Sequence, residues 1–479
     1  MKKFLLLFFL QIMTQNQTEE SEDPGGNTHS LFQNQFEFLI ISNLAETYQN
    51  TYKKAGGQTV AGSVERDLLE AERAVLYEEN NKVVVTSVPI NLDYLNDLKE
   101  SFGYSNLLNL YPASPNARLS LDILKDKNLF TQIEIIIKNN PGINIVPYYA
   151  TEEFFDLLAF LRQKNLKFST PETVSSRNRF IRDHYNCKVG FRKLWEKSAD
   201  VHSFVKIPQG FIVDDLTEAL DAAWWFYLHK TDFVMKYNRG TSGLGIIFYR
   251  CKDLPGKEND FKRYLRKNHR ERIWFEENFV VEEFIDVDED FFGGSPSIEF
   301  KVNSDLKHTY NCFQRLDVNA AFKGILISKQ LEDESDVDFE RAVDNCMDFG
   351  SSLEELGYKG IFDIDLVVDK KHNIYAVESN LRRTGGTHVY EAAMKLFGKN
   401  FRQKTFVASN DFLKLSSTIR TYQDFKSRTE KFFFSKATQE GIIPVITSYI
   451  EIGMIGYIIF APTLDRLERI EKELYTAVS

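Results

Sequence analysis

One segment, Ile361 to Asn380, constrains the fold most, because it reads as two strands that bring acidic side chains together. The apolar runs FDIDLVV and IYAVESN flank a turn-forming stretch from Asp369 to Asn373, a pattern typical of a β-hairpin. If the hairpin closes at the centre of that stretch, Asp365 lies opposite Glu378, and opposed side chains share a face with Cβ atoms about 4.5–5.5 Å apart. Two carboxylates that close repel each other unless a proton or a cation lies between them.

The predicted hairpin supplies oxygen ligands that suit a magnesium ion. Mg²⁺ typically keeps one or two protein carboxylates and fills the rest of its octahedron with water and substrate phosphate. Asp365, Glu378 and Asn380 offer such oxygens, and the same register sets Asp363 opposite Asn380. An alternative stays open: a five-residue loop would shift the register and separate the pair, leaving only the solvated face of an edge hairpin.

The segment from Thr231 to Arg250 reads as two strands joined by a glycine-rich loop. The first strand carries Lys236, the loop holds Gly240, Gly243 and Gly245, and the strand IIFY leaves it. Glycines let backbone N–H groups approach an anion closely and the lysine adds a positive charge, so the pattern predicts a phosphate loop on a hairpin. It fits neither the dinucleotide fingerprint, which opens a helix, nor the Gly-Lys-Ser/Thr loop. A flexible β-turn remains the alternative.

A third segment, Asn278 to Asp290, ends an apolar strand on acidic residues. Glu282 and Glu283 close the strand, and Phe284 and Ile285 follow. Such a strand end can offer backbone groups to the edge of a nucleotide base and an apolar wall to its ring. A plain strand end is the alternative.

The order of these elements resembles the ATP-grasp superfamily, and more closely its pheganomycin-type peptide ligases. In chain order, the shared elements are a first lysine (Lys188), a second lysine followed by a glycine loop (Lys236 and Gly240–Gly245), an acidic hinge (Glu282–Ile285), and an aspartate followed by Glu-x-Asn (Asp365 and Glu378–Asn380). The likeness runs from about residue 80 to the C-terminus. The stretches that carry it are VVVTSVPINLDYLNDL (Val83–Leu98), NARLSLDIL (Asn116–Leu124), CKVGFRKLW (Cys187–Trp195), SPSIEFKV (Ser295–Val302) with Gln314, and NLRRTGGTH (Asn380–His388).

The resemblance implies a role for each candidate residue. Lys188 and Lys236 would contact the nucleotide, and Lys236 and Arg382 would act at the transferring phosphate as catalytic residues. The segment Gly240–Gly245 would form a lid over the phosphates, and Glu282–Ile285 would bind adenine and ribose. The implied metal ligands are Asp365, Glu378 and Asn380.

Two residues depart from the pattern of that family. Glu299 stands where the closer relatives have Gln, and Asp363 stands where some ATP-grasp enzymes have Arg. These departures concern the acceptor pocket rather than the site for MgATP.

The activity that the resemblance implies is that of an ATP-dependent carboxylate–amine ligase. ATP would convert a carboxylate into an acyl phosphate, which an amine would attack to give an amide, ADP and phosphate. The cofactors would be ATP and Mg²⁺, with Mn²⁺ able to replace Mg²⁺, and the substrates small carboxylates and amines such as amino acids or peptides. Two alternatives stay open: a nucleotide-binding module derived from an ATP-grasp enzyme but without turnover, and a phosphotransferase.

The whole chain predicts an α+β protein with the ATP-grasp fold, in which two α+β lobes clasp ATP. Strands are expected at Lys82–Val88 and Ile143–Pro147, and helices at Ala150–Lys164, Leu216–His229 and Phe339–Leu356. The expected domains are a flexible leader (1–30), a pre-ATP-grasp-like α/β domain (31–170), the ATP-grasp domain (171–398) and a small C-terminal α+β domain (399–479). In the last of these, strands are expected at Lys431–Ser435, Ile442–Ser448 and Gly456–Phe460 and a helix at Leu464–Tyr475.

Charge and composition exclude several other classes. A net charge of -10 has the wrong sign for a protein that must neutralise nucleic-acid phosphates. The four cysteines lie more than thirty residues apart, which predicts reduced and mostly packed thiols. The apolar segment Gly441–Ala461 contains Pro444 and Glu451 and reads as strands rather than as a membrane span, which needs about 20 predominantly apolar residues.

The first residues imitate a secretory signal without completing one. Lys2 and Lys3 precede the apolar run Phe4–Leu10, but no Ala-x-Ala-like cleavage site follows, and Met13 offers an alternative start. We therefore expect a cytoplasmic protein with no membrane partner, and a homo-oligomer is compatible with the sequence.

Three further features are expected to be structural. The basic run Lys262–Arg272 reads as a solvated helix face rather than a grip for an anionic partner. The aromatic cluster Trp224–Tyr227 reads as core packing around a helix. His388 follows a glycine turn, where a structural role is commoner than the orienting of a substrate.

Overall fold

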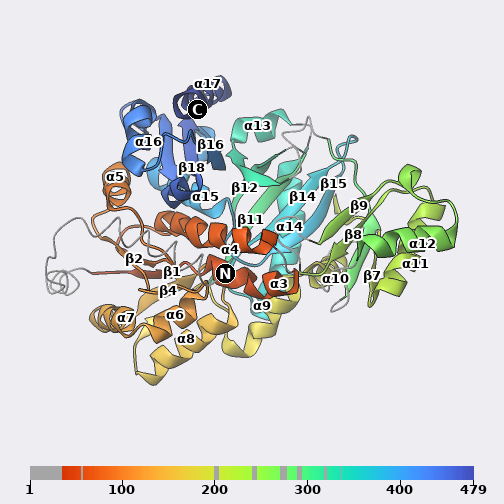
Figure 1. Cartoon of the computed structure of the whole chain (residues 1–479), viewed down its shortest axis with the longest axis horizontal. Coiled ribbons are helices and arrows are strands. Elements are labelled where there is room, and N and C mark those ends of the chain that lie inside the picture. The colour runs from red at the N-terminus through yellow and green to blue at the C-terminus, as the bar shows by residue number, and fades with distance from the viewer. Residues whose placement is uncertain are drawn as a thin grey trace.

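The computed structural model describes residues 35–55, 58–198, 204–239, 245–269, 278–288, 294–317, 321–335 and 337–479. The leader expected at residues 1–30 lies outside them. Three β-sheets organise the described residues. The four-stranded sheet lies at one end of the molecule and the five-stranded sheet at the other, and the nine-stranded sheet extends from above the five-stranded sheet toward the four-stranded one (Figure 1).

The five-stranded sheet is parallel, with strand order β3-β2-β1-β4-β5. Its strands are short and mostly apolar, which is typical of a sheet that helices cover on both faces. The strands are β1 (Phe38–Ile41), β2 (Lys82–Val85), β3 (Leu107–Leu110), β4 (Ile143–Pro147) and β5 (Phe168–Ser169). The helices are α3 (Leu44–Ala55), α4 (Gln58–Glu70), α5 (Leu92–Phe102), α6 (Leu119–Lys125), α7 (Lys127–Asn139) and α8 (Glu152–Gln163), with a 3-10 helix η1 at Ala71–Leu76.

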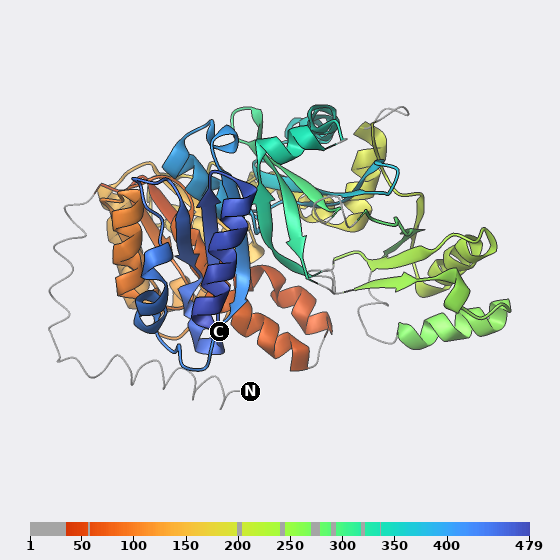
Figure 2. The same ribbon diagram turned by 90° about the horizontal axis from the view of Figure 1, so that it is seen from above.

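The four-stranded sheet is antiparallel, with strand order β7-β10-β8-β9. One of its faces packs on α11 and α12 around a separate apolar core, and the aromatic residues 224–227 lie against this core as expected, with Phe226 fully buried. The elements are β7 (Gly210–Val213), α11 (Leu216–Leu228), β8 (Phe233–Tyr237), β9 (Ile246–Tyr249), α12 (Glu258–Asn268) and β10 (Phe279–Glu283). Figure 2 shows this lobe projecting from the rest of the molecule.

The nine-stranded sheet has the order β17-β18-β16-β13-β12-β11-β14-β15-β6, and every pair in it is antiparallel except β15 with β6. Its strands are β6 (Val205–Lys206), β11 (Pro296–Val302), β12 (Leu306–Leu316), β13 (Phe322–Ile327), β14 (Gly360–Val368), β15 (Ile374–Asn380), β16 (Phe406–Lys414), β17 (Gly441–Val445) and β18 (Met454–Ala461). Its helices are α9 (Arg179–Tyr185), α10 (Lys188–Ser198), α13 (Lys329–Glu334), α14 (Phe339–Leu356), α15 (Thr387–Phe397), α16 (Tyr422–Thr429) and α17 (Leu464–Val478).

The expected C-terminal strands are found in part. Strands β17 and β18 cover most of the apolar segment Gly441–Ala461, and no described helix combines the length and apolar character that a membrane span requires. The prediction of a strand at Lys431–Ser435 is wrong. A 3-10 helix occupies Glu430–Phe432, and only single bridges follow, because Gln439 and Gly441, both at positive φ, turn the chain too soon for a ladder.

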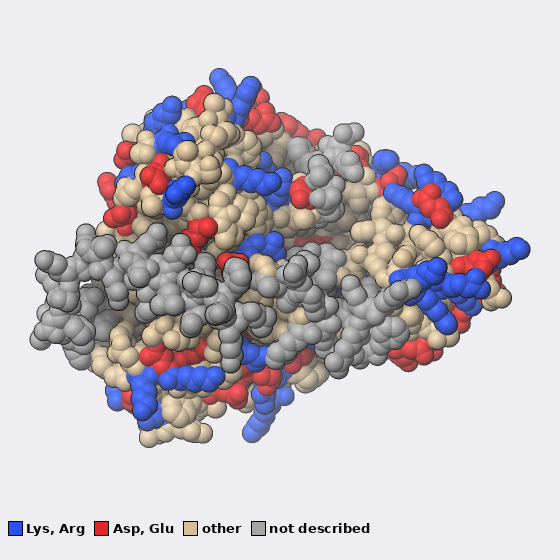
Figure 3. Space-filling view, viewed as in Figure 1, with Lys and Arg blue, Asp and Glu red and all other residues tan. Residues whose placement is uncertain are grey.

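Other expectations from composition also stand. All four cysteines are free, and three of them are buried. In the described part of the basic run, Lys262 contacts Asp221 and Glu258, and Arg263 contacts Asp260, so acidic neighbours compensate part of the charge on a solvated helix. Figure 3 shows acidic and basic side chains interspersed over the end of the molecule that α11 and α12 form.

Candidate active site

The hairpin β14–β15 places its acidic residues face to face, as the sequence predicts. Asp365 pairs with Glu378 and Asp363 with Asn380. On the other side of β14, Asp365 pairs with Ser297 and Asp363 with Glu299 of β11. Two rows of polar side chains therefore cross three strands on one face of the nine-stranded sheet.

A β-bulge produces this register. The loop Asp369–Asn373 has five residues, so the strands near it pair one position out, with Val368 opposite Ile374 and Leu366 opposite Ala376. Between Leu366 and Asp365 the register shifts by one residue, which leaves Val377 as the extra residue. The bulge turns the even-numbered residues of β15 from the face shared with Leu366 to the face shared with Asp365.

Of the two aspartates of β14, Asp363 is buried and Asp365 is half-buried, and both share one amide partner. Asn380 Nδ2 donates to Asp363 Oδ1 at 2.9 Å and to Asp365 Oδ2 at 3.0 Å, and Gln314 Nε2 donates to Asp365 Oδ1 at 2.9 Å. Burial raises the pKa of Asp363 to about 7, and burial with the neighbouring carboxylates raises the pKa of Asp365 well above its usual range. These groups need a proton or a cation to share the site.

Helix α10 connects this sheet to the four-stranded sheet. Its first residue, Lys188, is buried and places Nζ 3.1 Å from Glu378 Oε2 on β15. One turn later Arg192 places its guanidinium 3.3 Å from Glu282 Oε2 on β10. Because residues four apart lie on the same face of a helix, one face of α10 carries two cations into the space between the sheets.

Lys236 lies on β8 and forms an ion pair with Glu282 Oε1. Both side chains are buried, and both belong to the face of the four-stranded sheet that is turned away from α11 and α12. The glycine-loop prediction falls mostly outside the described residues, since Gly240 and Gly243 are not among them. Gly245 is described, with φ +79°, and a Cβ there would lie 2.8 Å from Tyr237 Cβ, so the close approach to β8 requires glycine.

The strand end that follows Glu282 makes mainly backbone contacts. Glu283 Oε1 accepts a hydrogen bond from the backbone N–H of Gln209 at 2.7 Å, and Phe284 N–H donates to Asp232 O at 2.8 Å. The Phe284 ring lies under the Arg250 guanidinium, 4.0 Å from its centroid. Ile285 is half-buried in the loop beyond the strand.

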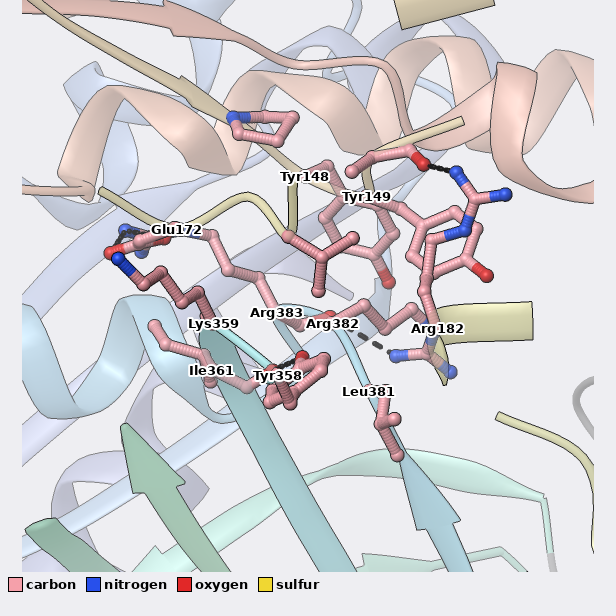
Figure 4. A pocket seen from close by; sticks show the side chains of 14 residues that line it. Tyr148, Tyr149, Glu172, Arg182, Tyr358, Lys359, Ile361, Leu381, Arg382 and Arg383 are labelled. Carbon is pink, nitrogen blue, oxygen red and sulfur yellow. Dashed lines mark hydrogen bonds and ion pairs between the residues drawn. The ribbon is translucent and has the colours of Figure 1, made fainter. Parts of the chain in front are cut away.

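Arg382 follows β15 and lies beside the acidic rows. Its NH2 donates to Asn380 Oδ1 at 2.9 Å and its NH1 to Arg383 O at 3.1 Å, and the guanidinium lies 5.7 Å from the ring centroids of Tyr48 and Tyr148. Arg382 also lines a small cavity. Figure 4 shows this cavity between residues that follow β4, such as Tyr148 and Tyr149, and residues just before and at the start of β14, such as Tyr358 and Ile361.

Solved structures share the fold of this chain, whereas no protein-family model and no curated protein matches the sequence. The biotin carboxylase–β-γ-ATP complex from Campylobacter jejuni aligns over 94% of this chain and 93% of its own, with a TM-score of 0.55 and 11% identity. The chain has the ATP-grasp fold. The α+β fold predicted from the sequence is thereby confirmed.

Two further ATP-grasp structures align over most of their length. The biotin carboxylase domain dimer of the Hydrogenobacter thermophilus 2-oxoglutarate carboxylase, in complex with MgADP, ADP and bicarbonate, covers 91% of this chain and 90% of its own at a TM-score of 0.51 and 14% identity. The N5-carboxyaminoimidazole ribonucleotide synthetase of Thermus thermophilus covers 92% and 98% at a TM-score of 0.50 and 9% identity.

The ATP-grasp fold of this chain brings the predicted residues into two groups. Asp365, Glu378, Asn380, Arg382 and Lys188 are linked to one another by contacts on the nine-stranded sheet. The second group, on the four-stranded sheet, pairs a lysine with the acidic strand end, Lys236 with Glu282. Within the described residues no group of three or more His, Cys, Asp or Glu side chains is arranged to hold a metal ion, so the candidate metal set rests on two carboxylates and one amide.

Glu299, one of the two departures from the family pattern, is a buried anchor for the turn before α15. Its Oε2 accepts hydrogen bonds from Thr387 Oγ1 at 2.6 Å, Thr384 Oγ1 at 3.2 Å and Tyr310 OH at 3.2 Å. Burial raises the pKa of Glu299 to about 7. The side chain therefore holds the segment that carries Arg382 rather than facing the cavity.

Sequence reasoning missed two clusters behind the site. Arg383 is buried among Glu78, Glu172 and Glu391, with Lys301 also contacting Glu172. Arg73 lies 3.7 Å from Asp411 in a second buried cluster. The partners of each cluster come from distant parts of the chain, so no local spacing signals them.

His388 is fully buried, which supports the structural interpretation from the sequence. Neither ring nitrogen has a hydrogen-bond partner among the described residues, and burial, assisted by the charge of Arg73, lowers the pKa of the imidazole well below its usual value.

Proposed function

We propose that this chain is an ATP-dependent carboxylate–amine ligase. The observation that supports this most is the contact of Lys188 with Glu378, which lies directly opposite Asp365. Without a ligand, the lysine compensates the glutamate. Binding of a triphosphate with its cation would break this ion pair. A phosphate oxygen would then contact Lys188, and the cation would contact Glu378.

The donor set of the hairpin suits Mg²⁺. Asp365 and Glu378 supply carboxylate oxygens. Desolvation, followed by repulsion from Asp363 and Glu378, raises the pKa of Asp365, and a bound cation would offset both effects. Asn380 would supply its amide oxygen. This oxygen now accepts a hydrogen bond from Arg382, so the Asn380 side chain would have to rotate for the oxygen to contact the cation. Bound Mg²⁺, or Mn²⁺ in its place, would neutralise charge on the triphosphate.

The nucleotide would lie between the two sheets that α10 connects. Lys188 and Lys236 would bind phosphates, the segment Gly240–Gly245 would close over them, and Glu282–Ile285 would hold adenine and ribose. The ATP-grasp fold and the burial of both lysines support these roles, because buried cations bind phosphate oxygens strongly.

The reaction would proceed in two displacements. An oxygen of the substrate carboxylate would attack the γ-phosphorus of ATP, forming a P–O bond as the bond to the β-phosphate oxygen breaks and ADP leaves. The amine nitrogen would then attack the acyl carbon, the C–O bond to phosphate would break, and the nitrogen would lose a proton. Arg382 and Lys236 would stabilise charge on the transferring group.

The cavity beside Arg382 is the candidate site for the carboxylate. Arg382 has no carboxylate within ion-pair distance among the described residues, and it lies between the cavity and Asn380. Aromatic and apolar residues share the lining with the charged side chains of Glu172, Arg182, Lys359 and Arg383, and charges of both signs suit the ammonium and carboxylate groups of an amino acid. The cavity has a volume of about 20 Å³, so a substrate would have to widen it on binding. The pheganomycin-type stretches support amino acids or peptides as substrates, and a cytoplasmic location and a homo-oligomer remain predictions.

The test is ADP release from the full chain with MgATP and pairs of amino acids. We expect release to depend on both a carboxylate and an amine, and to be abolished by Asp365→Ala or Glu378→Ala with circular dichroism unchanged. Glu355→Ala, an exposed acidic position on α14, is the matched control and should retain full activity. Near-full activity in either hairpin variant would show that the ligands are wrongly assigned.

The same assay separates the alternatives. ADP release that needs the carboxylate but not the amine would identify a phosphotransferase. Binding of MgATP without any ADP release would identify a nucleotide-binding module.

A further inference from the structure

Arg192 is a buried cation that sequence analysis did not single out. It lies on α10 with 3% of its surface exposed. Its NH1 lies 3.3 Å from Glu282 Oε2, its NH2 donates to Pro208 O, and its Nε lies 3.3 Å from Glu196, whose side chain is half exposed. Arg192 therefore ties α10 to the chain that enters β7 and to the end of β10.

Two buried cations share the one buried carboxylate of Glu282. Lys236 contacts Oε1 and Arg192 contacts Oε2, and all three residues are buried. Glu196 compensates little, because an exposed ion pair is weak in water. The cluster therefore carries an excess positive charge in a place of low dielectric, which favours the entry of an anion.

The backbone of β7 is shaped to allow this cluster. Gly210 lies directly opposite Glu282 in the β7–β10 pair. A Cβ at this position would lie 2.6 Å from Glu282 Cβ and 2.8 Å from Arg192 NH2. Glycine at position 210 therefore leaves the space in which Arg192 contacts Glu282, and a larger residue would fill it.

We propose that Arg192 is a positioning residue for nucleotide binding: it keeps Glu282 fixed and compensated, so that Lys236 is able to turn from this carboxylate to a nucleotide phosphate. This inference rests on the proposed function. Without Arg192, Lys236 would be the sole ion-pair partner of Glu282 among the described residues. Phosphate would then have to compete with Glu282 for Lys236, because a buried charge left unpaired is costly. The effect belongs to binding of ATP, not to the later displacement at carbon.

The test measures MgATP binding by calorimetry, and KM and kcat for ATP, in the full chain. Arg192→Met should weaken MgATP binding and raise KM by about tenfold or more while kcat changes by less than about threefold, the signature of lost ground-state binding. Lys193→Met removes an exposed charge from the same helix and should leave both constants unchanged. Gly210→Ala leaves Arg192 in place but crowds its contact, and should raise KM in the same way.

A double-mutant cycle with Glu282→Gln distinguishes positioning from support of the fold. Once Glu282 is neutral, Lys236 needs no release, so adding Arg192→Met should change MgATP binding by less than about twofold. Two results would overturn the inference while leaving the ligase proposal intact. One is that Arg192→Met weakens MgATP binding as much in the Glu282→Gln background as in the wild type. The other is that Arg192→Met and Gly210→Ala both bind MgATP as tightly as the wild type does. Absence of MgATP binding in the wild-type chain would refute both.

Discussion

Asp411 is a carboxylic acid that the fold buries without a hydrogen bond. It lies in the bulged part of β16, both carboxyl oxygens lack a partner among the described residues, and Arg73 is 3.7 Å away. Burial raises the pKa of Asp411 to about 8, although Arg73 opposes the shift. An unfolded chain would return this pKa to about 3.9.

This shift predicts how stability depends on pH. Between about pH 4 and pH 8 the folded state binds the proton that the unfolded state has lost, so the contribution of Asp411 to stability falls as pH rises through this window. Asp411→Asn removes the titration. We expect the variant to match the wild type in melting temperature near pH 4 and to exceed it increasingly up to pH 8.5, measured by thermal unfolding in matched buffers. A difference that is constant across the range would contradict the assignment.

Glu299 is expected to contribute to stability through its three hydroxyl donors. Glu299→Ala leaves buried hydroxyls of Thr384, Thr387 and Tyr310 without an acceptor, which should lower the free energy of unfolding by about 1–3 kcal/mol. Glu299→Gln keeps one acceptor oxygen and should cost less. Urea denaturation of both variants gives the comparison, and equal losses would show that volume rather than hydrogen bonding matters here.

At the scale of elements, the two strands of the hairpin β14–β15 were predictable from the sequence, but the bulge between them was not. The strands and the pairing of Asp365 with Glu378 follow from the apolar pattern and the turn residues. The loop does have five residues, which shifts the pairing next to it by one position. The bulge at Val377 reverses this shift and restores the pairing of Asp365 with Glu378. Because a bulge has no fixed sequence signature, only the structure reveals why the register holds.

Helix α17 gives an element-scale prediction. Its apolar face, with Leu467, Ile470 and Leu474 buried, packs on β16 and β18. Leu474→Ala should lower the free energy of unfolding by about 2–5 kcal/mol through lost burial and the cavity left behind. Lys472→Ala, on the exposed side of the same helix, should change it by less than about 0.5 kcal/mol. Denaturant unfolding of both variants is the check, and similar values would mean that the helix is not part of the core.

At the scale of the whole molecule, the Arg383 cluster joins segments that lie far apart in the sequence. Glu78 and Glu172 come from the N-terminal part, Glu391 from α15 and Lys301 from β11. Desolvation outweighs the attraction of Arg383 and raises the pKa of Glu78 to about 7. The cluster therefore holds the parallel sheet against the loop that carries Arg382.

Removing Arg383 should weaken the whole molecule. Arg383→Met leaves three carboxylates facing Lys301 alone, and breaking a buried ion pair costs about 3–5 kcal/mol. Lys395→Met removes the exposed pair of α15 with Glu79 and should cost at most about 1 kcal/mol. Chemical denaturation measures both losses, and equal small losses would show that the cluster does not join the parts.

The sequence by itself determined the local pieces of this protein. A buried apolar run specified β4, helical spacing of apolar residues specified α14, and two apolar runs around turn residues specified the hairpin β14–β15. Residue types specified which side chains carry charge near the site. These follow from contacts between near neighbours, whose periods of 2 and 3.6 residues are readable along the chain. The limits of the predicted domains and the roles of the site residues remain predictions.

Only the tertiary structure decided how the pieces meet. It set Lys188 against Glu378 and Arg192 against Glu282 across two sheets, buried Glu299 as an anchor, and enclosed Arg383 among acids from three regions. The physical reason is that burial and charge compensation depend on neighbours brought together by packing, and no one-dimensional spacing encodes such neighbours.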